Sequence, residues 1–174
     1  MSAVTLTQLQ AIMPLARARA AAFLAPLNAA MVEFGITTPA RQASFLSQVG
    51  HESGQLRYVR ELASGQAYEG RADLGNTQRG DGVRFRGRGL LQVTGRANYA
   101  ACGKALGLDL LDQPELLEQA VNACRSAGWF WQTKGLNALA DAGDQAKVTR
   151  RINGGTNGLA ERLALFAVAQ RVLA

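Results

Sequence analysis

The chain has 174 residues, of which 48% are hydrophobic and 18% charged. This length fits one domain with a substantial core, and abundant Ala and Leu with few β-branched runs favour a mostly helical fold. No apolar stretch approaches the roughly 20 residues that span a bilayer as a helix, so we expect no membrane-spanning helix. Lys and Arg outnumber Asp and Glu by 19 to 13, a net charge of +6. That balance favours a polyanionic partner, which can be nucleic acid, an anionic membrane surface or a cell-wall polymer.

Residues 1–8 lack the basic and then apolar order of a secretion signal, so we expect no signal peptide. The two cysteines, Cys102 and Cys124, have neither Cys-x-x-Cys spacing nor a neighbouring His. We therefore expect no metal site and no cofactor. A reduced pair is the default prediction, and a disulfide stays open as the alternative.

In chain order, residues 5–34 are predicted to form two helical pieces interrupted by Pro14 and Pro26. A third helix is predicted from Pro39 to Gly54, because Thr38 suits the N-cap position and a proline suits the first helical turn.

This third helix carries an ionisable group on its apolar face. With Phe45 as the origin and about 100° per residue, Val49 lies near 40° and Glu52 near −20°. A carboxyl held against apolar side chains resists ionisation and can donate a proton near neutral pH, as a general acid must. The structural alternative is a buried Glu that an Arg or a backbone amide satisfies.

Residues 55–93 lose helical periodicity and are rich in Gly and Arg. A long irregular segment inside a compact domain is usually functional. Glu61 lies near its start among polar and small neighbours. One carboxyl in an apolar setting and a second in a polar setting is the arrangement of a glycosidase acid and base. Glu69 and Asp73 are rival bases, and Glu69 can instead form an ion pair with Arg71.

Helical pattern returns after Thr94, which can cap a helix that runs to about Leu106. The capping box at residues 112–115 predicts a further helix that reaches Trp131. The chain ends with two predicted helices, at about residues 145–152 and 159–173. The last one is apolar nearly all round, which indicates a core helix rather than one that inserts at a membrane.

The most specific motif is FRGRGLLQVTGRANY at residues 85–99. Together with His-Glu-Ser-Gly at 51–54 and Ile-Asn-Gly-Gly at 152–155, it resembles glycoside hydrolase family 19, which comprises plant and bacterial chitinases and phage endolysins. The resemblance covers about residues 41–166 and points to the compact phage-endolysin type. It implies one catalytic domain over residues 1–174, mainly α and lysozyme-like. The Gly/Arg-rich segment, with room for a small β element, would line a substrate cleft.

Position by position, the resemblance implies that Glu52 is the general acid, that Glu61 is the general base and that Thr94 helps to hold the attacking water. The substrate-binding positions that it implies are Gln92, Asn98, Tyr99, Asn153 and Arg162. In relatives, the arginine at the last of these positions pairs with the catalytic carboxylate region.

Structural alternatives stay open at several of these motifs. Thr94 can cap the helix that follows it, alone or in addition to a catalytic role. Arg86 and Arg88 are expected to be structural or to steer substrate rather than to catalyse. His51, the only histidine, lacks the nucleophile and acidic partner of a triad, and residues 129–131 are expected to lie in the core.

The segment between Glu61 and Arg86 is shorter than in plant chitinases, and their disulfide framework is absent. A more open groove would admit peptidoglycan, whose sugars carry lactyl-peptide substituents. We therefore expect an endolysin-type glycosidase that cleaves β-1,4 bonds of peptidoglycan strands by an inverting mechanism. It would be made in the host bacterial cytoplasm and act on the wall after release, as a monomer without stable membrane insertion.

Two other functions stay open. A chitinase acting on β-1,4 N-acetylglucosamine polymers is the alternative within enzymes. A basic nucleic-acid-binding module is the alternative of another class, but the sequence has no helix-turn-helix spacing, no aromatic RNA motif and no zinc site. We therefore expect no nucleic-acid partner.

Overall fold

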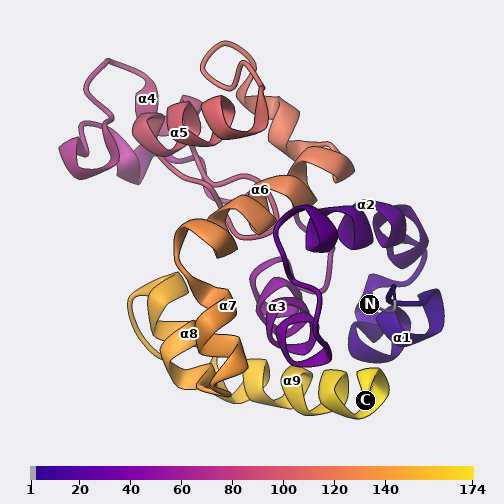
Figure 1. Cartoon of the computed structure of the whole chain (residues 1–174). Coiled ribbons are helices and arrows are strands. Elements are labelled where there is room, and N and C mark those ends of the chain that lie inside the picture. The colour runs from indigo at the N-terminus through magenta and orange to yellow at the C-terminus, as the bar shows by residue number, and fades with distance from the viewer. Residues whose placement is uncertain (1–2) are drawn as a thin grey trace.

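Helices make up almost all of the regular structure in residues 3–174, which a computed structural model of the chain describes (Figure 1). The α-helices are α1 (Leu6–Ile12), α2 (Arg19–Glu33), α3 (Pro39–Glu52), α4 (Asp81–Arg84), α5 (Arg96–Leu106), α6 (Ala120–Thr133), α7 (Leu136–Asp141), α8 (Gln145–Asn153) and α9 (Leu159–Leu173). The 3-10 helices are η1 (Pro14–Ala16), η2 (Gln66–Tyr68), η3 (Ala72–Leu74) and η4 (Pro114–Glu118). Two isolated antiparallel bridges, Arg60–Arg88 and Arg88–Val93, stand where a small β element was expected. The mainly α fold is confirmed.

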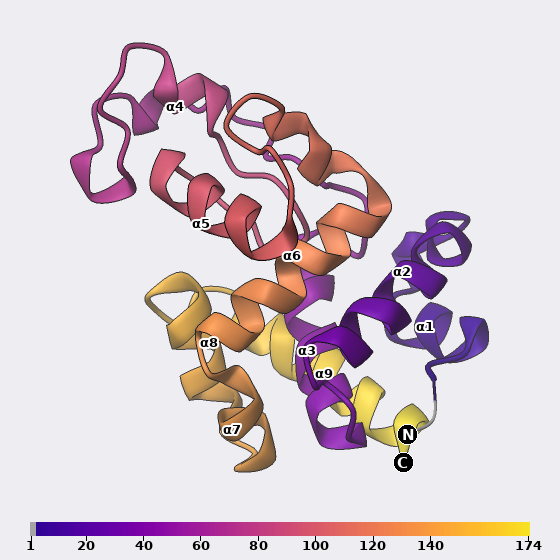
Figure 2. The same ribbon diagram turned by 45° about the horizontal axis from the view of Figure 1, so that its top comes forward.

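The helices are arranged around α3 and α6. α3 packs against α9, α2 packs against α6, and α1 also contacts α9. Figures 1 and 2 both show α4 and α5, with the irregular chain around them, on the opposite side of α6 from α9. α3 ends at Glu52, and the chain then passes into the irregular segment. The end of α3 therefore connects the helices that surround α3 to the irregular chain around α4 and α5.

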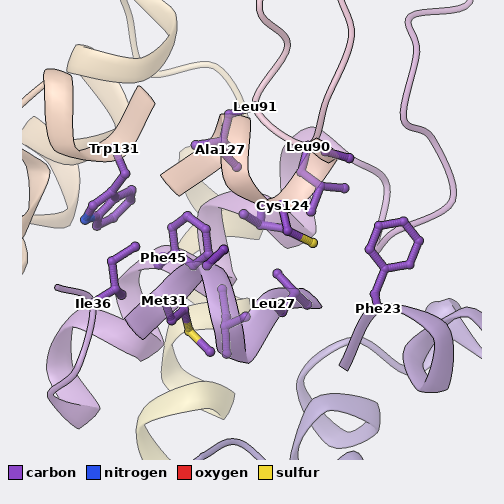
Figure 3. Close-up of a cluster of buried hydrophobic side chains, with 14 of the residues drawn as sticks. Phe23, Leu27, Met31, Ile36, Phe45, Leu90, Leu91, Cys124, Ala127 and Trp131 are labelled. Carbon is purple, nitrogen blue, oxygen red and sulfur yellow. The ribbon is translucent and has the colours of Figure 1, made fainter. Parts of the chain in front are cut away.

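α3 forms as predicted because local signals agree with its tertiary packing. The Thr38 hydroxyl accepts a hydrogen bond from the Arg41 N–H at 3.2 Å and so caps the helix. Phe45 is fully buried, and its ring meets Trp131 edge-on with 5.3 Å between centroids (Figure 3). Side chains of this size contribute about 1.5–3 kcal/mol each when they are buried. The same cluster holds Met31 and Ile36, so it joins α2, α3 and α6 into one core.

The predicted break at Pro26 is wrong, because α2 continues through this proline. An internal proline removes one helical hydrogen bond, at a cost of about 3 kcal/mol. Phe23 and Leu27, on either side of it, are buried against the core. Burial on both sides offsets the local penalty. Pro14 does interrupt the first segment, where it starts η1.

The predicted starts of two later helices also shift. α5 begins after Gly95, and the Thr94 hydroxyl makes no cap; it donates to the Gln92 carbonyl at 3.1 Å. The capping box at residues 112–115 leads only into η4, and the extended backbone of Gln119 separates η4 from α6. α7 lies in a region for which the sequence pattern predicted no helix.

Polar contacts hold the irregular segment in place. The Asp81 carboxylate, almost fully buried, pairs with the Arg96 guanidinium at 2.7 Å, and this hydrogen bond lowers the pKa of Asp81. The backbone N–H of Arg96 donates to the Asn76 side chain at 2.8 Å, and that side chain donates to the Tyr68 carbonyl at 2.8 Å. This chain of contacts fixes η2 relative to α5.

α9 is less enclosed than predicted. Its buried side chains are Arg162, Leu165 and Ala169, whereas Leu163 is 42% exposed. The helix therefore packs one face on α1 and α3 and leaves an outer face in contact with solvent. Among residues 3–174, no helix is both long enough and apolar enough to cross a membrane.

Cys102 and Cys124 are buried and unpaired, which agrees with the default prediction of reduced thiols. Burial raises the pKa of the Cys102 thiol to about 12 and also raises that of the Cys124 thiol, so both behave as small apolar side chains. Within residues 3–174, no group of three or more His, Cys, Asp or Glu side chains is placed to hold a metal ion.

Candidate active site

Glu52 is the last residue of α3, and its carboxylate faces an arginine. The Arg162 Nη2 lies 2.5 Å from Glu52 Oε1. The apolar stripe is present, because Phe45 and Val49 are fully buried. However, a guanidinium rather than apolar side chains faces the carboxyl, so the structural alternative of a Glu that an Arg satisfies is the arrangement observed. The ion pair that the family resemblance implied for Arg162 is present.

Arg162 is itself held from several directions. Its Nη1 donates to Gln48 Oε1 at 2.5 Å, and its Nε donates to the Asn157 carbonyl at 3.2 Å. The Gln48 amide in turn donates to the Thr149 hydroxyl at 3.3 Å. Because Arg162 is only 2% exposed, it presents its donors to Glu52 and Gln48 rather than to a sugar. This network orients the Glu52 carboxylate from α3, α8 and α9.

His51 has an acidic partner that the sequence pattern did not indicate. Its Nδ1 lies 2.7 Å from Glu161 Oε2, in the first turn of α9. The ring lies against Gly158, where an added Cβ would come within 2.1 Å of the His51 Cε1. The 110-residue separation between the two partners explains why local sequence patterns missed this pair.

Glu61 is held at both carboxylate oxygens. The Gly87 N–H donates to its Oε1 at 2.7 Å, and the Tyr68 hydroxyl donates to its Oε2 at 2.9 Å. Burial of the phenol, followed by its contact with Glu61, raises the pKa of Tyr68, so the hydroxyl remains a donor. A carboxylate has about four lone-pair directions, so Glu61 can still accept a proton from water. Tyr68 was not predicted, because no periodicity marks a residue in this irregular segment.

The rival bases have structural partners. Glu69 accepts the N–H groups of Gly80 at 2.7 Å and of Gly82 at 2.8 Å, and so holds the start of α4. The Glu69–Arg71 pair that the sequence left open is absent, because Arg71 pairs with Asp73 at 2.5 Å. The Arg71 hydrogen bond lowers the pKa of Asp73.

Gly87 connects Glu61 with the polar residues of the main motif. The Glu61 N–H also donates to the Gly87 carbonyl at 3.0 Å, so the two backbones are paired. An added Cβ on Gly87 would lie 2.3 Å from Gln92 Oε1 and 3.3 Å from Thr94 Oγ1. Glu61, Gln92 and Thr94 therefore converge on this residue, and a larger residue here would displace the Gln92 side-chain amide. Gly87 was not among the predicted site residues.

Three of the predicted residues line one hollow. Gln92, Thr94 and Asn98 surround a space of about 250 Å³, together with the half-buried rings of Trp129 and Phe130. The Asn98 amide donates to the Thr94 carbonyl at 2.7 Å, next to the start of α5. Amides beside an apolar ring suit a sugar, which has hydroxyls at its edge and C–H groups on its face.

Residues 129–131 contact the core, and two of them also line this hollow. Trp131 lies in the core as predicted, and its ring nitrogen donates to Asn137 at 2.9 Å. Trp129 and Phe130 are half-buried: they pack against the core cluster and also line the hollow. The predicted core position therefore applies to all three residues, and the contact of two of them with the hollow was not predicted.

Tyr99 is fully buried, and both of its hydroxyl contacts are internal. The hydroxyl donates to the Arg86 carbonyl at 2.6 Å and accepts from Arg88 Nη1 at 3.1 Å. Arg88 also pairs with Glu118 at 2.8 Å. The side chains of Tyr99 and Arg88 both pack beneath the Gly-Arg-Gly turn. Tyr99 therefore has no exposed surface with which to contact a sugar.

Asn153 is exposed at the end of α8. Its Oδ1 accepts the Gly155 N–H at 2.8 Å and its Nδ2 donates to the Asn157 carbonyl at 3.1 Å. These contacts close the turn that carries Gly158 against His51. Substrate contact by Asn153 stays a prediction.

Comparison with known proteins places these residues in a family. The sequence model described as chitinase class I matches residues 27–163. A glycosyl hydrolase family 19 domain-containing protein of Haemophilus influenzae is 34% identical over 172 residues, which covers 80% of this chain and 84% of that protein. An endochitinase of Arabidopsis thaliana is 36% identical over 135 residues, 77% of this chain but only 46% of the plant enzyme. The chain thus spans about half the length of the plant relative.

Solved structures agree in fold. Chitinase C from Streptomyces griseus superimposes with a TM-score of 0.80 at 24% identity, over 98% of this chain and 92% of that one. A class IV chitinase from Zea mays gives a TM-score of 0.73 at 24% identity, over 99% and 92% of the two chains. These structures support the arrangement of the helices, and the sequence matches supply the family. The chain belongs to glycoside hydrolase family 19.

Proposed function

We propose that the protein hydrolyses β-1,4 bonds in polymers that contain N-acetylglucosamine. The observation that carries this proposal is the convergence of Glu61, Gln92 and Thr94 on Gly87, in a family 19 domain whose α3 ends in Glu52. A carboxyl on each side of a sugar site is the minimum that acid/base hydrolysis of a glycoside requires.

In the proposed mechanism, Glu52 protonates the glycosidic oxygen and Glu61 removes a proton from the attacking water. Arg162 stabilises the carboxylate that remains on Glu52 after its proton leaves, because the guanidinium already lies 2.5 Å away. The Tyr68 hydroxyl and the Gly87 N–H fix the direction of the Glu61 carboxylate. Thr94 helps to hold the water. Direct attack by water inverts the anomeric carbon.

Chitin is the first candidate polymer. The relatives from Arabidopsis and from Streptomyces carry the name chitinase or endochitinase, which supports unsubstituted N-acetylglucosamine chains as substrate.

Peptidoglycan is the second candidate. It shares the N-acetylglucosamine β-1,4 linkage and adds acidic peptides to every other sugar. The net charge of +6 and the arginines beside Glu61 favour it. An endolysin role, with release from a host cytoplasm to the wall and action as a monomer, is part of this second proposal.

Purified chitin oligosaccharides and purified peptidoglycan separate these candidates. Release of new reducing ends should be measured for the wild type and for Glu52→Gln on each polymer. Hydrolysis that disappears in the variant supports the proposed active site. A wild type that releases no reducing ends from either polymer contradicts it, and the preferred polymer identifies the substrate.

A further inference from the structure

A basic groove leads away from Glu61. Two adjoining hollows of about 520 and 280 Å³ share Arg19, Arg57 and Tyr58, and the smaller one reaches Glu61 itself. We call their lining the arginine groove, after its five arginines: Arg17, Arg19, Arg57, Arg60 and Arg86. The groove thus begins at the proposed general base.

The positive charge of this groove is only partly balanced. Its acidic side chains are Glu61 and Glu118. Glu118 is already engaged, because Arg88 lies 2.8 Å away and Arg60 lies 3.6 Å away. Anions near the groove therefore meet an excess of guanidinium groups, and the concave shape strengthens their attraction.

The arginines of the groove differ in how many hydrogen bonds and ion pairs their side chains make within the protein. Arg19 donates to the carbonyls of Leu56 and Arg57, so it supports the chain. Arg86 has no hydrogen-bond or ion-pair partner for its side chain among residues 3–174, and its Nε is buried. A buried donor without a partner is rare in folded proteins. Its guanidinium is therefore available to a ligand or to water in the groove.

Arg57 is the second arginine with free donors. Its Nε donates to the Gly54 carbonyl at 2.9 Å, and its guanidinium lies 5.5 Å from the Tyr58 ring centroid. Its terminal nitrogens make no hydrogen bond or ion pair with another side chain or backbone group in residues 3–174, and the residue lines both hollows. Leu62, which is 83% exposed, adds an apolar surface to the same groove.

These features match a short acidic peptide better than a bare sugar chain. An N-acetylglucosamine polymer is uncharged, so it offers the five arginines hydrogen-bond acceptors but no opposite charge. Carboxylates form paired hydrogen bonds with the planar guanidinium group, and the exposed side chain of Leu62 suits small apolar side chains. Nucleic acid is less favoured, because the groove offers only one aromatic ring, Tyr58, and Arg57 already covers it.

We propose that the arginine groove binds the carboxylates of peptides attached to the sugar next to the bond that is cut. This inference rests on the proposed hydrolysis at Glu52 and Glu61, and it names peptidoglycan as the polymer that the site prefers. Arg57 and Arg86 are then residues that determine specificity, while the bond-breaking groups stay the same for either polymer.

The test compares two forms of one polymer. Glycan strands with their peptides, and the same strands after an amidase has removed the peptides, are digested by the wild type and by the double variant Arg57→Gln/Arg86→Gln. We expect the ratio of kcat/KM for peptide-bearing over stripped strands to fall about tenfold or more in the double variant, because two charge-assisted contacts are lost. Arg57→Lys/Arg86→Lys should retain part of the preference, since it keeps the charge.

Arg171→Gln is the matched control. It removes one positive charge from the exposed end of α9, and its ratio should equal that of the wild type. Thermal unfolding of every variant checks that the fold is kept. A fall for Arg171→Gln that is comparable per charge removed would show that net charge, not the groove, sets the preference, and would overturn the proposal.

A binding experiment separates the failure of this inference from failure of the hydrolase proposal. An acidic tetrapeptide, and the same peptide with amidated carboxyls, are titrated into the wild type and the double variant and followed by NMR. Only the acidic peptide should bind, and only to the wild type. If strands are cut but the peptide neither binds nor alters kcat/KM, the groove proposal is wrong and the hydrolase stands. A short DNA duplex that displaces the peptide at lower concentration would replace our proposal with phosphate binding.

Discussion

Arg162 and Glu52 lie 110 residues apart in the sequence and meet at 2.5 Å, so the C-terminal helix completes the environment of the proposed acid. Arg162 is buried, and its other donors make hydrogen bonds to the Gln48 side chain and the Asn157 carbonyl. The position of the Glu52 carboxyl is therefore set by α9 as much as by α3. This coupling makes the activity sensitive to changes well outside the Gly/Arg-rich segment.

Glu52→Gln should remove hydrolysis and preserve the fold. Gln has nearly the same shape and can still accept a hydrogen bond from Arg162, but it cannot donate the proton that the leaving oxygen needs. General acid catalysis is worth about 10²–10⁴-fold, and the rate should fall by that factor. Reducing-end assays and thermal unfolding of the same preparation check both statements. A folded variant with the wild-type rate would remove Glu52 from the mechanism.

Exchanging the two candidate bases separately identifies the one that acts. Glu61→Gln should lower the rate by about 10²–10⁴-fold. Glu69→Gln should mainly loosen the loop at Gly80 and Gly82, because two backbone donors lose a charged acceptor. A loss of about 1–3 kcal/mol in unfolding free energy with residual activity is expected for that variant. The opposite result, an inactive Glu69→Gln and an active Glu61→Gln, would reverse the assignment.

Gly87→Ala should damage the site more than the fold. The new Cβ would lie 2.3 Å from Gln92 Oε1 and 3.3 Å from Thr94 Oγ1, so the Gln92 side-chain amide must move away from the site. We expect a loss of roughly 1–3 kcal/mol in stability and at least a tenfold loss in kcat/KM. Gly143→Ala is the control: Gly143 has φ +73° but open space around it, so only stability should fall. Equal activity of the two variants would argue against convergence at Gly87.

Much of the fold could be predicted because its signals are local. The Thr38 cap and the stripe of Phe45 and Val49 define α3 from neighbouring residues alone, and they place Glu52 at its end. The sequence pattern wrongly predicted a helix break at Pro26. α2 continues because the neighbours of Pro26 are buried in the tertiary structure, which local sequence does not show. The single helix predicted from the capping box at residues 112–115 was also wrong, because the extended backbone of Gln119 separates η4 from α6.

The site was harder to predict because its contacts join distant or irregular parts of the chain. The family resemblance assigned roles to Glu61, Gln92 and Thr94, of which only Gln92 and Thr94 lie in the motif at residues 85–99. It gave no indication that Tyr68 holds Glu61, because η2 has no periodic pattern. We expected apolar side chains around Glu52, but Arg162 lies there instead. Arg162 is on the face of α9 that packs on α3.

The stereochemistry of the product should be inverted. Direct attack by water requires space between the two carboxyls, roughly 6.5–9.5 Å, and forms no covalent intermediate. NMR of the product immediately after cleavage, before the anomers equilibrate, reports the configuration at the new reducing end. A β-anomer from a β-linked substrate, or a trapped glycosyl-enzyme, would contradict the assignment of Glu61 as a base.

Removing α9, residues 159–174, should unfold the domain. The deletion takes away Arg162 together with Leu165 and Ala169, which pack on α3. It would leave Glu52 and Gln48 without their partner, and loss of one member of a buried polar cluster is strongly destabilising. Circular dichroism should then show no cooperative thermal transition, and hydrolysis of purified polymer should be lost.

The exposed outer face of α9 allows a milder test of the same helix. Leu163→Glu places a charge on a side chain that is 42% exposed, so stability and hydrolysis of purified polymer should stay close to the wild type. If α9 served to insert at membranes, this variant would fail only against intact membranes, because a charge on the apolar face weakens insertion. A truncated protein that stays folded and cuts purified polymer normally would contradict the structural role. Because Arg162 is buried and pairs with Glu52, we expect the truncated protein to be inactive on every substrate. We expect Leu163→Glu to be active on every substrate.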